Sequence, residues 1–475
     1  MPKFNIVTLG CEKNNVDSEG MGSLLVEAGY EQSASAEDSD LLIVNTCAFL
    51  QAAVDESVGE LKALAEKKRE GQVLISAGCM SERYAADVPT WAPGVDGTIS
   101  TRSWPEIVPF VEKLRGQGSQ ATVVQAPVAT ASGAPLPLEI APASIAWAPI
   151  APVQMTSQLK RFRRKAKGPS AYVKISEGCD HKCAFCIIPA IRGKHVSRPV
   201  EEIAGEVAEL AEQGVKEVVL IAQDSTYYGI DLGYRDGLAR LFGAIAEQAP
   251  GIMWVRLMYA YPTQVSPSTI EAMSKYPNVA RYIDMPLQHA HPDTLKRMKR
   301  PNDMERTRRL IGSLREAMPD IALRTTFIVG FPGETDEEFK TLLDFLDEVK
   351  FDNVGMFTYS PEKGTPAAEM PGQVPEKLKM KRYREAMLRQ QKISAHKNRR
   401  LVGQTMDVLV DGAGTLEDGK GRVLPIYVGR TYRQAPEVDG MVFVRPPKGG
   451  TLETGAVVRV KITESTEYDL WGKTV

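Results

Sequence analysis

Cysteine and histidine are scarce in this chain of 475 residues, with six and five copies respectively. A net charge of −2 argues against a protein that coats nucleic acid over its whole surface, although a local basic patch is compatible with it. No apolar run approaches the roughly 18 residues of a membrane span, and the first residues show no signal-peptide layout. The sequence therefore predicts a cytoplasmic, multidomain enzyme with no membrane association.

The six cysteines fall into two sets of three. We call Cys11, Cys47 and Cys79 the N-terminal cysteines, and Cys179, Cys183 and Cys186 the barrel cysteines. Disulfides explain them poorly in a cytosolic chain, whereas metal binding or redox chemistry explains them well. The placement of the cysteines is therefore the most informative feature of the sequence.

The barrel cysteines have the spacing C-x-x-x-C-x-x-C. A zinc site with His181 or His195 as fourth ligand is one interpretation, but zinc knuckles usually come in pairs. Three thiolates on one short loop suit three corners of a 4Fe–4S cubane and leave one iron open. The loop resembles the signature of the radical S-adenosylmethionine (SAM) enzymes, and the aromatic Phe185 fits it. The resemblance implies that SAM binds the open iron and is cleaved to a 5′-deoxyadenosyl radical.

From about residue 171 the sequence alternates between strand and helix patterns. The expected strands are Ala171–Ser176, Glu217–Ala222, Met253–Met258, Arg281–Met285, Leu323–Val329 and Asn353–Tyr359. The expected helices include Val200–Gln213, Gly237–Gln248, Arg306–Met318 and Asp336–Val349, the last opening with a capping box from Thr335 to Glu338. Repeating β-α units imply a parallel sheet. Six units are two short of a closed barrel, so an open partial (β/α)6 barrel is expected.

Polar and glycine residues follow several of these strands, at the end where barrel enzymes place their active sites. Each signal is weak alone: a Gly-Phe-Pro-Gly stretch is often a plain turn, and a lone histidine such as His289 is often structural. The radical SAM resemblance implies that the glycine-rich segment approaches adenine, while the ends of the second and fourth strands approach the ribose and methionine parts of SAM. The predicted cofactor-binding residues are Phe185, Gln223, Asp224, Gln288, Gly330, Gly333 and Glu334.

The first 117 residues read as a separate, open parallel α/β domain. Strands are expected at Phe4–Leu9, Leu41–Asn45 and Val73–Ser76, with helices near Val16–Glu27 and Ala52–Lys67. Each strand ends in a loop that carries one N-terminal cysteine, and ligands of such sheets bind outside the carboxyl ends of the strands. Three buried core cysteines are the alternative. A second three-cysteine cluster is favoured, because each cysteine follows its apolar run instead of lying within it.

The remaining segments complete the predicted organisation. Residues 118–157 hold ten Ala, six Pro and one charged residue, which is typical of an extended linker, and a basic run follows at 160–165. A helix is expected over Glu376–Arg400, with ten Lys or Arg against two Glu. It could be a solvated helix or a face for an RNA-containing partner. Strands at Met406–Val410, Val423–Val428, Met441–Arg445 and Val457–Thr463 indicate a small β-barrel that resembles the TRAM module. The predicted domains are 1–117, the linker and basic run 118–164, the radical SAM core 165–400, and a TRAM-like barrel 401–475.

Together these features resemble the methylthiotransferases among the radical SAM enzymes. The resemblance implies two 4Fe–4S clusters held by all six cysteines, which are then the catalytic and metal-binding residues. It also implies two SAM molecules, one giving a methyl group and one the radical, and an electron donor such as flavodoxin or ferredoxin. The reaction it implies is insertion of a methylthio group at an unactivated C–H bond.

Two subfamilies differ in substrate. One modifies an adenosine of tRNA, and the other modifies the β-carbon of an aspartate on small-subunit ribosomal protein twelve. The segments Lys174–Cys179, Leu9–Glu19 and Met285–Ala290 resemble the second, which implies a ribosomal protein as partner, free or within the subunit. Residues 401–475 carry nine Lys or Arg and ten Asp or Glu, and such a neutral module suits a protein substrate better than tRNA phosphates.

Three alternatives stay open at this point. A tRNA methylthiotransferase would share the chemistry and differ in substrate. A non-enzymatic zinc- or RNA-binding protein would bind zinc and cleave no SAM. A radical SAM enzyme with inert N-terminal cysteines would hold one cluster per chain.

Overall fold

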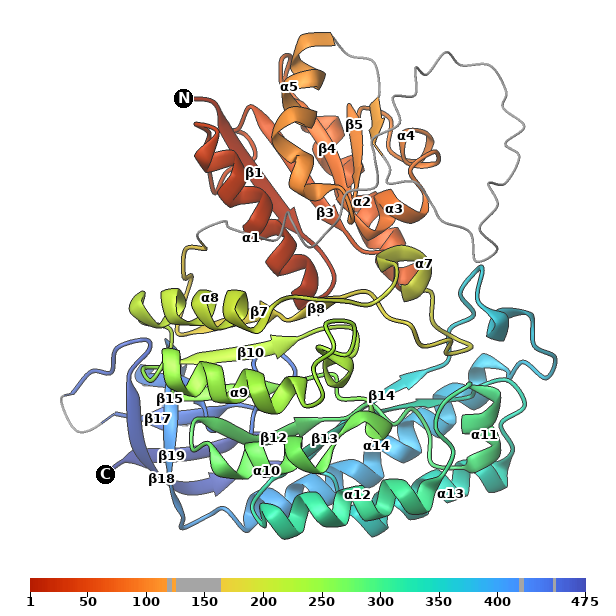
Figure 1. Cartoon of the computed structure of the whole chain (residues 1–475), viewed down its shortest axis with the longest axis vertical. Helices are drawn as coiled ribbons and strands as arrows, with labels where there is room; N and C mark the ends of the chain where they lie inside the picture. The colour runs from red at the N-terminus through yellow and green to blue at the C-terminus, as the bar shows by residue number, and fades with distance from the viewer. Residues whose placement is uncertain (118–121, 125–163, 418–422, 447–449) are drawn as a thin grey trace. The chain divides into compact units, whose positions relative to one another are not determined.

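The computed structural model describes residues 1–117, 122–124, 164–417, 423–446 and 450–475 (Figure 1). Most of the predicted Ala/Pro-rich linker and most of the basic run lie outside the described residues. Within the linker the structure describes only residues 122–124, which form a strand of the first unit's sheet where the sequence predicted an extended linker. The chain divides into two compact units: residues 1–164 with 190–193, and residues 165–189 with 194–475. Within the described part, no helix has the length and apolarity to cross a membrane.

The first unit is built on a six-stranded parallel sheet in the order β2-β1-β3-β4-β5-β6. The strands are β1 (Lys3–Thr8), β2 (Glu31–Gln32), β3 (Leu41–Thr46), β4 (Val73–Gly78), β5 (Gly97–Ser100) and β6 (Thr122–Val124). The helices are α1 (Glu12–Glu27), α2 (Gln51–Lys67), α3 (Cys79–Arg83), α4 (Val88–Trp91) and α5 (Ile107–Gln117), with a 3-10 turn η1 (Trp104–Glu106). The three predicted strands are present, and the structure adds β2, β5 and β6.

Both faces of this sheet are covered, as a parallel sheet requires. Leu41, Ile43 and Ile75 form one core cluster with residues of α1 and α5. The alternate residues Leu42 and Leu74 are also buried, and α2 contacts β3 and β4. The helix α1 begins earlier than predicted, at Glu12 directly after Cys11.

The second unit holds the predicted open sheet of six parallel strands, in the order β14-β13-β12-β11-β10-β7 (Figure 1). The strands are β7 (Ser170–Lys174), β10 (Glu217–Ile221), β11 (Trp254–Leu257), β12 (Val279–Asp284), β13 (Ala322–Val329) and β14 (Asn353–Thr358). The helices are α7 (Ile188–Arg192), which crosses the division between the units, α8 (Val200–Glu212), α9 (Gly237–Gln248), α10 (Pro267–Lys275), α11 (Pro292–Arg297), α12 (Met304–Ala317), α13 (Asp336–Val349) and α14 (Glu376–Arg399). Short elements are β8 (Ser176–Glu177), β9 (Val196–Ser197), η2 (Ser225–Tyr227), η3 (Pro262–Gln264) and η4 (Pro366–Glu369).

The predicted features of α13 and α14 can be compared with the structure. Thr335 and Glu338 form the predicted capping box at the start of α13. The basic helix α14 is partly structural, because Lys379 and Arg382 are buried against the sheet's loops. Lys379 donates to the Tyr359 carbonyl, and Arg382 pairs with Glu334.

The C-terminal segment is a closed barrel in the order β15-β16-β17-β19-β18. Its strands are β15 (Thr405–Glu417), β16 (Val423–Arg430), β17 (Val442–Arg445), β18 (Val457–Ser465) and β19 (Leu470–Thr474). The sequence predicted four strands, and the fifth, β19, closes the barrel by pairing with both β17 and β18.

Buried polar contacts join this barrel to the amino end of the six-stranded sheet. Glu217, the first residue of β10, is fully buried between Arg256 and Arg430. The Tyr282 hydroxyl donates to Asp439 Oδ2 at 2.7 Å. The carboxyl end of the sheet is thus left to the loops that carry the barrel cysteines.

Candidate functional site

The N-terminal cysteines lie at the carboxyl ends of three adjacent strands of the first unit. Cys11 follows β1 and caps α1, Cys47 follows β3, and Cys79 opens α3 directly after β4. Because β1, β3 and β4 are neighbours in the sheet, the three loops meet at one edge. A Cβ on Gly10 would lie 2.9 Å from Cys47 Sγ, so the loop before Cys11 touches Cys47 directly.

The environment of these thiols is buried. Burial raises the pKa of Cys79 to about 12, and it raises the pKa of Cys47 as well. Like-charge repulsion from Cys11 and Cys47 raises the pKa of Cys79 further. Arg192 opposes these effects at both Cys47 and Cys79. These two thiols stay protonated near neutral pH in the absence of a bound cation. A bound metal centre would stabilise their thiolate forms, and the three cysteines could ligate it together.

The barrel cysteines occupy the loop after β7 in the second unit. Burial raises the pKa of Cys179 to about 11 and that of Cys186 to about 12. The backbone N–H of Ile188 donates to Cys186 Sγ at 3.4 Å, and Arg300 Nη1 lies 3.8 Å from Cys183 Sγ. These donors face sulfur atoms that would carry negative charge as metal ligands.

A stack of three side chains lies beside this loop. The rings of His181 and Tyr261 are parallel with centroids 3.7 Å apart, and the guanidinium of Arg300 lies 4.0 Å from the Tyr261 centroid. His181 Nε2 is 2.7 Å from Asp224 Oδ2. Neither Tyr261 nor Arg300 was predicted as a site residue, because single residues on separate loops leave no local pattern in a sequence.

The predicted residues after β10 are held by defined partners. Asp224 is buried, and its Oδ1 accepts from the N–H and the hydroxyl of Thr226. Gln223 Nε2 donates to Glu177 Oε1 at 2.6 Å, while the buried Gln223 Oε1 accepts no hydrogen bond from the described residues. That orphaned acceptor is compatible with a donor from a bound ligand.

The predicted residues after β12 and β13 form the other side of this edge. Gln288 has φ +73° and bridges to β13 through its backbone. His289 is fully buried, with Nε2 3.5 Å from Glu334 Oε2. Phe185 lies edge-on to Phe331 at 6.4 Å between centroids, so it packs on the glycine-rich loop.

Glu334 braces the glycine-rich loop from within. Its Oε2 accepts from the N–H of Gly330 at 2.8 Å, and its Oε1 accepts from Arg382 at 2.9 Å. Gly330 and Gly333 both have positive φ, and a Cβ on Gly330 would lie 2.4 Å from Lys379 Cγ. The structure therefore places Glu334 on the protein's own backbone, where it fixes the loop's shape.

The donor set of each cysteine group, three thiols, suits a 4Fe–4S cluster with one open iron. Around zinc at about 2.3 Å, tetrahedral sulfurs would lie about 3.8 Å apart. Among the described residues, the only metal-capable group with all donors within 4.8 Å is His291, Asp293 and Glu338. Glu338 there is paired with Arg297 at 2.7 Å. The sulfurs of neither cysteine set all lie within 4.8 Å of one another.

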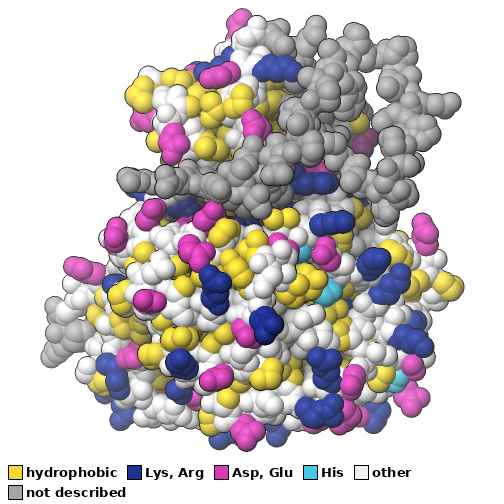
Figure 2. Space-filling model, in the orientation of Figure 1, with side chains coloured by type: hydrophobic (Ala, Val, Ile, Leu, Met, Phe, Trp, Pro, Cys, Tyr) yellow, Lys and Arg dark blue, Asp and Glu magenta, His cyan; other side chains and the backbone are white. Residues whose placement is uncertain are grey.

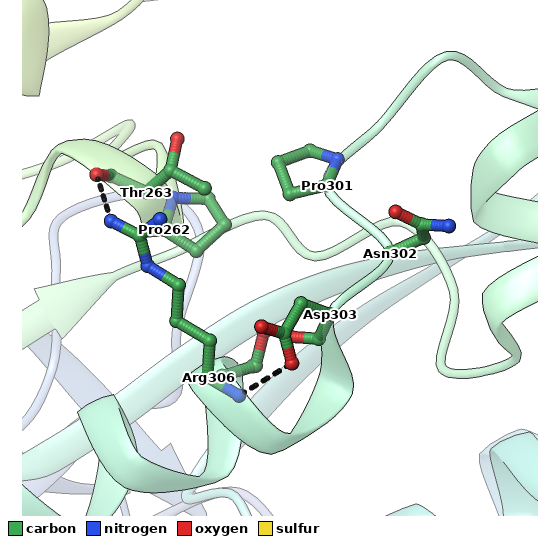
Figure 3. A pocket seen from close by; sticks show the side chains of 7 residues that line it. Pro262, Thr263, Pro301, Asn302, Asp303 and Arg306 are labelled. Carbon is green, nitrogen blue, oxygen red and sulfur yellow. Dashed lines mark hydrogen bonds between the residues drawn. The ribbon is translucent and has the colours of Figure 1, made fainter.

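One cavity of about 140 Å³ lies in the second unit, between the loop after β11 and the start of α12 (Figure 3). Its lining includes Pro262, Asp303 and Arg306, with Arg306 donating to the Thr263 carbonyl. It contains none of the predicted site residues.

Comparison with known proteins agrees with this arrangement. Residues 173–346 match the model described as the Radical SAM superfamily, residues 3–100 match Uncharacterized protein family UPF0004, and residues 402–475 match the TRAM domain. A protein of Roseiflexus sp. (strain RS-1), named ribosomal protein uS12 methylthiotransferase RimO, is 49% identical over 100% of this chain and 97% of its own. This chain belongs to the RimO family. A relative of the same name from Chloroflexus aurantiacus is 48% identical over 99% of this chain and 99% of its own length. Another from Synechocystis sp. is 42% identical over 100% of this chain and 98% of its own length.

Solved structures show a shared fold. The radical SAM methyltransferase TsrM from Kitasatospora setae, solved with cobalamin and a [4Fe-4S] cluster, aligns with a TM-score of 0.52 at 13% identity, covering 88% of this chain and 78% of TsrM. Membership of the RimO family and the Radical SAM match identify a radical SAM methylthiotransferase that uses an iron–sulfur cluster and SAM.

Proposed function

We propose that this RimO-family enzyme inserts a methylthio group at the β-carbon of an aspartate on ribosomal protein uS12. The relatives' printed names supply the protein substrate, and the sequence resemblance supplies the aspartate. We also propose that all six cysteines ligate two 4Fe–4S clusters, one per set. The observation that carries the second cluster is the convergence of the N-terminal cysteines at one sheet edge.

An unactivated C–H bond has no acidic hydrogen, so a general base cannot open the reaction. When bound, the barrel cluster and SAM would supply the radical that removes this hydrogen, and the N-terminal cluster would hold the sulfur that is transferred. The protein's own residues position these groups. The barrel cysteines would hold three irons of the cluster and leave the fourth for SAM. Glu334 fixes the Gly330 loop. Gln223 offers an acceptor that no described residue uses.

Several further features belong to this proposal. We propose that Phe185, Gln223, Asp224, Gln288, Gly330, Gly333 and Glu334 shape the SAM site, with Glu334 acting through the loop. A donor such as flavodoxin or ferredoxin is required, because the barrel cluster must be reduced before each cleavage. We also retain the domain limits 1–117, 118–164, 165–400 and 401–475, and the cytoplasm as the location in which uS12 is encountered.

A tRNA substrate is not favoured. The relatives that span the chain are named for uS12. On the face of the second unit seen in Figure 2, Lys and Arg are interspersed with Asp and Glu, without the continuous basic field that tRNA phosphates would favour.

Two variants test the division of labour between the cysteine sets. Cys179→Ala should abolish 5′-deoxyadenosine formation, because two thiolates hold a cubane poorly. Cys47→Ala should keep SAM cleavage and lose methylthiolation of uS12. Cleavage by Cys179→Ala would contradict the barrel assignment, and full methylthiolation by Cys47→Ala would remove the N-terminal cluster from the mechanism.

A further inference from the structure

Arg192 lies in the polypeptide that follows the barrel cysteines, yet residues 190–193 pack with the first unit. Its side chain is only 3% exposed. The guanidinium donates to Asp17 Oδ2 at 2.8 Å, to Asn14 Oδ1 at 2.6 Å and to Cys79 Sγ at 3.4 Å. Arg192 therefore brings a buried positive charge into hydrogen-bond contact with one of the N-terminal cysteines.

The partners of Arg192 are themselves fixed. Asn14 is fully buried, and its Nδ2 donates to the carbonyls of Leu9 and Thr46, which lie close before Cys11 and Cys47 in the chain. The orientation of Asn14 leaves its oxygen for Arg192. Because these bonds define where the guanidinium sits, its contact with Cys79 is part of a built site and is not a chance approach.

The charge balance at this site is also defined. Asp17 is buried beside the guanidinium and offsets part of its charge. Hydrogen bonds to ligand sulfurs and nearby positive charge stabilise the reduced, more negative form of an iron–sulfur cluster. Arg192 and Asp17 therefore act on such a cluster in opposite directions.

We propose that Arg192 is a positioning residue that raises the reduction potential of the N-terminal cluster through its hydrogen bond to Cys79, and that Asp17 moderates this effect. The inference rests on the proposed function, in which the N-terminal cysteines hold a cluster. It extends that function by assigning a residue from outside the first 117 residues to the control of the N-terminal cluster.

The test uses the full chain with all three barrel cysteines changed to alanine, so that only the N-terminal cluster contributes to the signal. Iron is counted, and the cluster is titrated with a reductant while its electron paramagnetic resonance signal is followed. Arg192→Gln, Arg192→Lys and Asp17→Asn are made in this background. Arg115→Gln, which removes an exposed positive charge from the same unit, is the control.

At the midpoint potential of the parent protein, Arg192→Gln should show a reduced-to-oxidised ratio about tenfold lower, which is a 59 mV shift for one electron. Arg192→Lys should fall between the parent and Arg192→Gln, since it keeps the charge and loses the planar fork. Asp17→Asn should raise the ratio, and Arg115→Gln should leave it unchanged. A merely structural role would not give opposite signs for Arg192 and Asp17.

A change of less than threefold in Arg192→Gln, or a change of the same sign in Asp17→Asn, would overturn the role of Arg192. If Arg192→Gln fails to retain iron, the other two variants decide the question. Arg192→Lys should lower the reduced-to-oxidised ratio and Asp17→Asn should raise it. Iron missing from the parent background itself would overturn the N-terminal cluster and this inference together. An intact cluster with unchanged potentials would overturn only the inference.

Discussion

Gly78 stands directly before Cys79 in a backbone conformation that only glycine adopts easily, with φ +94° and ψ −151°. A Cβ at this position would lie 2.3 Å from Asn45 Oδ1 and 2.7 Å from the main-chain oxygen of Thr46. Gly78→Ala therefore changes the end of β4 while leaving all six cysteines in the chain.

The cost of Gly78→Ala has two parts. Backbone strain in this region costs of the order of 1–3 kcal/mol, and an overpacked methyl group adds about 1–3 kcal/mol because the Thr46 backbone cannot move freely. The first unit should lose roughly 2–6 kcal/mol of stability. That is a large fraction of the stability of an ordinary domain.

Two glycines of the same unit provide controls. Gly71 also has a positive φ, +83°, but a Cβ there meets nothing within 4 Å, so Gly71→Ala should show strain without a clash. Gly59 lies within α2 with open space around it, and Gly59→Ala should stabilise by about 0.5–1 kcal/mol.

The assay is amide hydrogen exchange in urea, read on peptides of β3 and β4, because the chain has two units and a single unfolding transition is not assured. Gly78→Ala should also retain less iron at the N-terminal cysteines. An exchange free energy for Gly78→Ala within about 0.5 kcal/mol of that for Gly71→Ala would refute the reasoning, since the clash would then cost nothing.

Three further predictions concern the second unit. Arg430→Met should destabilise the second unit by about 3–5 kcal/mol in urea, because the buried Glu217 loses a partner. The control Arg459→Met, on the exposed barrel surface, should cost under about 1 kcal/mol. Equal costs for the two variants would contradict the buried pairing. Burial alone would raise the pKa of Glu217, but the charges of Arg256 and Arg430 hold this pKa below its ordinary value of 4.5. The ionised Glu217 therefore contributes stability above pH 4.5, and this contribution is lost as the pH falls through the folded-state pKa. Urea midpoints measured from about pH 3 to 6 should show this loss, and a midpoint that does not fall in acid would contradict it. Thr335→Ala should cost about 0.5–2 kcal/mol through loss of the cap on α13. Amide hydrogen exchange on peptides of α13 measures this cost, and an unchanged exchange free energy would contradict it.

The sequence predicted the strands that are continuous apolar runs, since burial on both faces leaves that pattern. It missed β5, which is only four residues long and starts with Gly97, and β19, whose five residues are interrupted by Gly472. Both strands exist because neighbouring strands supply their hydrogen bonds, and such pairing is invisible in a local pattern.

The candidate site divides in the same way. The spacing of the barrel cysteines is local, and it predicted the Radical SAM match. Arg192 was missed because its partner Cys79 lies far away in the chain, so only the folded structure brings them together. The role of Glu334 in SAM binding stays a prediction. Because its carboxylate accepts a hydrogen bond from the Gly330 N–H, Glu334 would act by fixing the glycine-rich loop.

The most direct test of uS12 methylthiolation is a mass spectrum of ribosomal protein uS12 from cells with and without this gene. We expect a mass increase of one methylthio group, located on an aspartate and lost on deletion. Identical uS12 spectra from both strains, with iron and SAM cleavage confirmed in the purified enzyme, would contradict it.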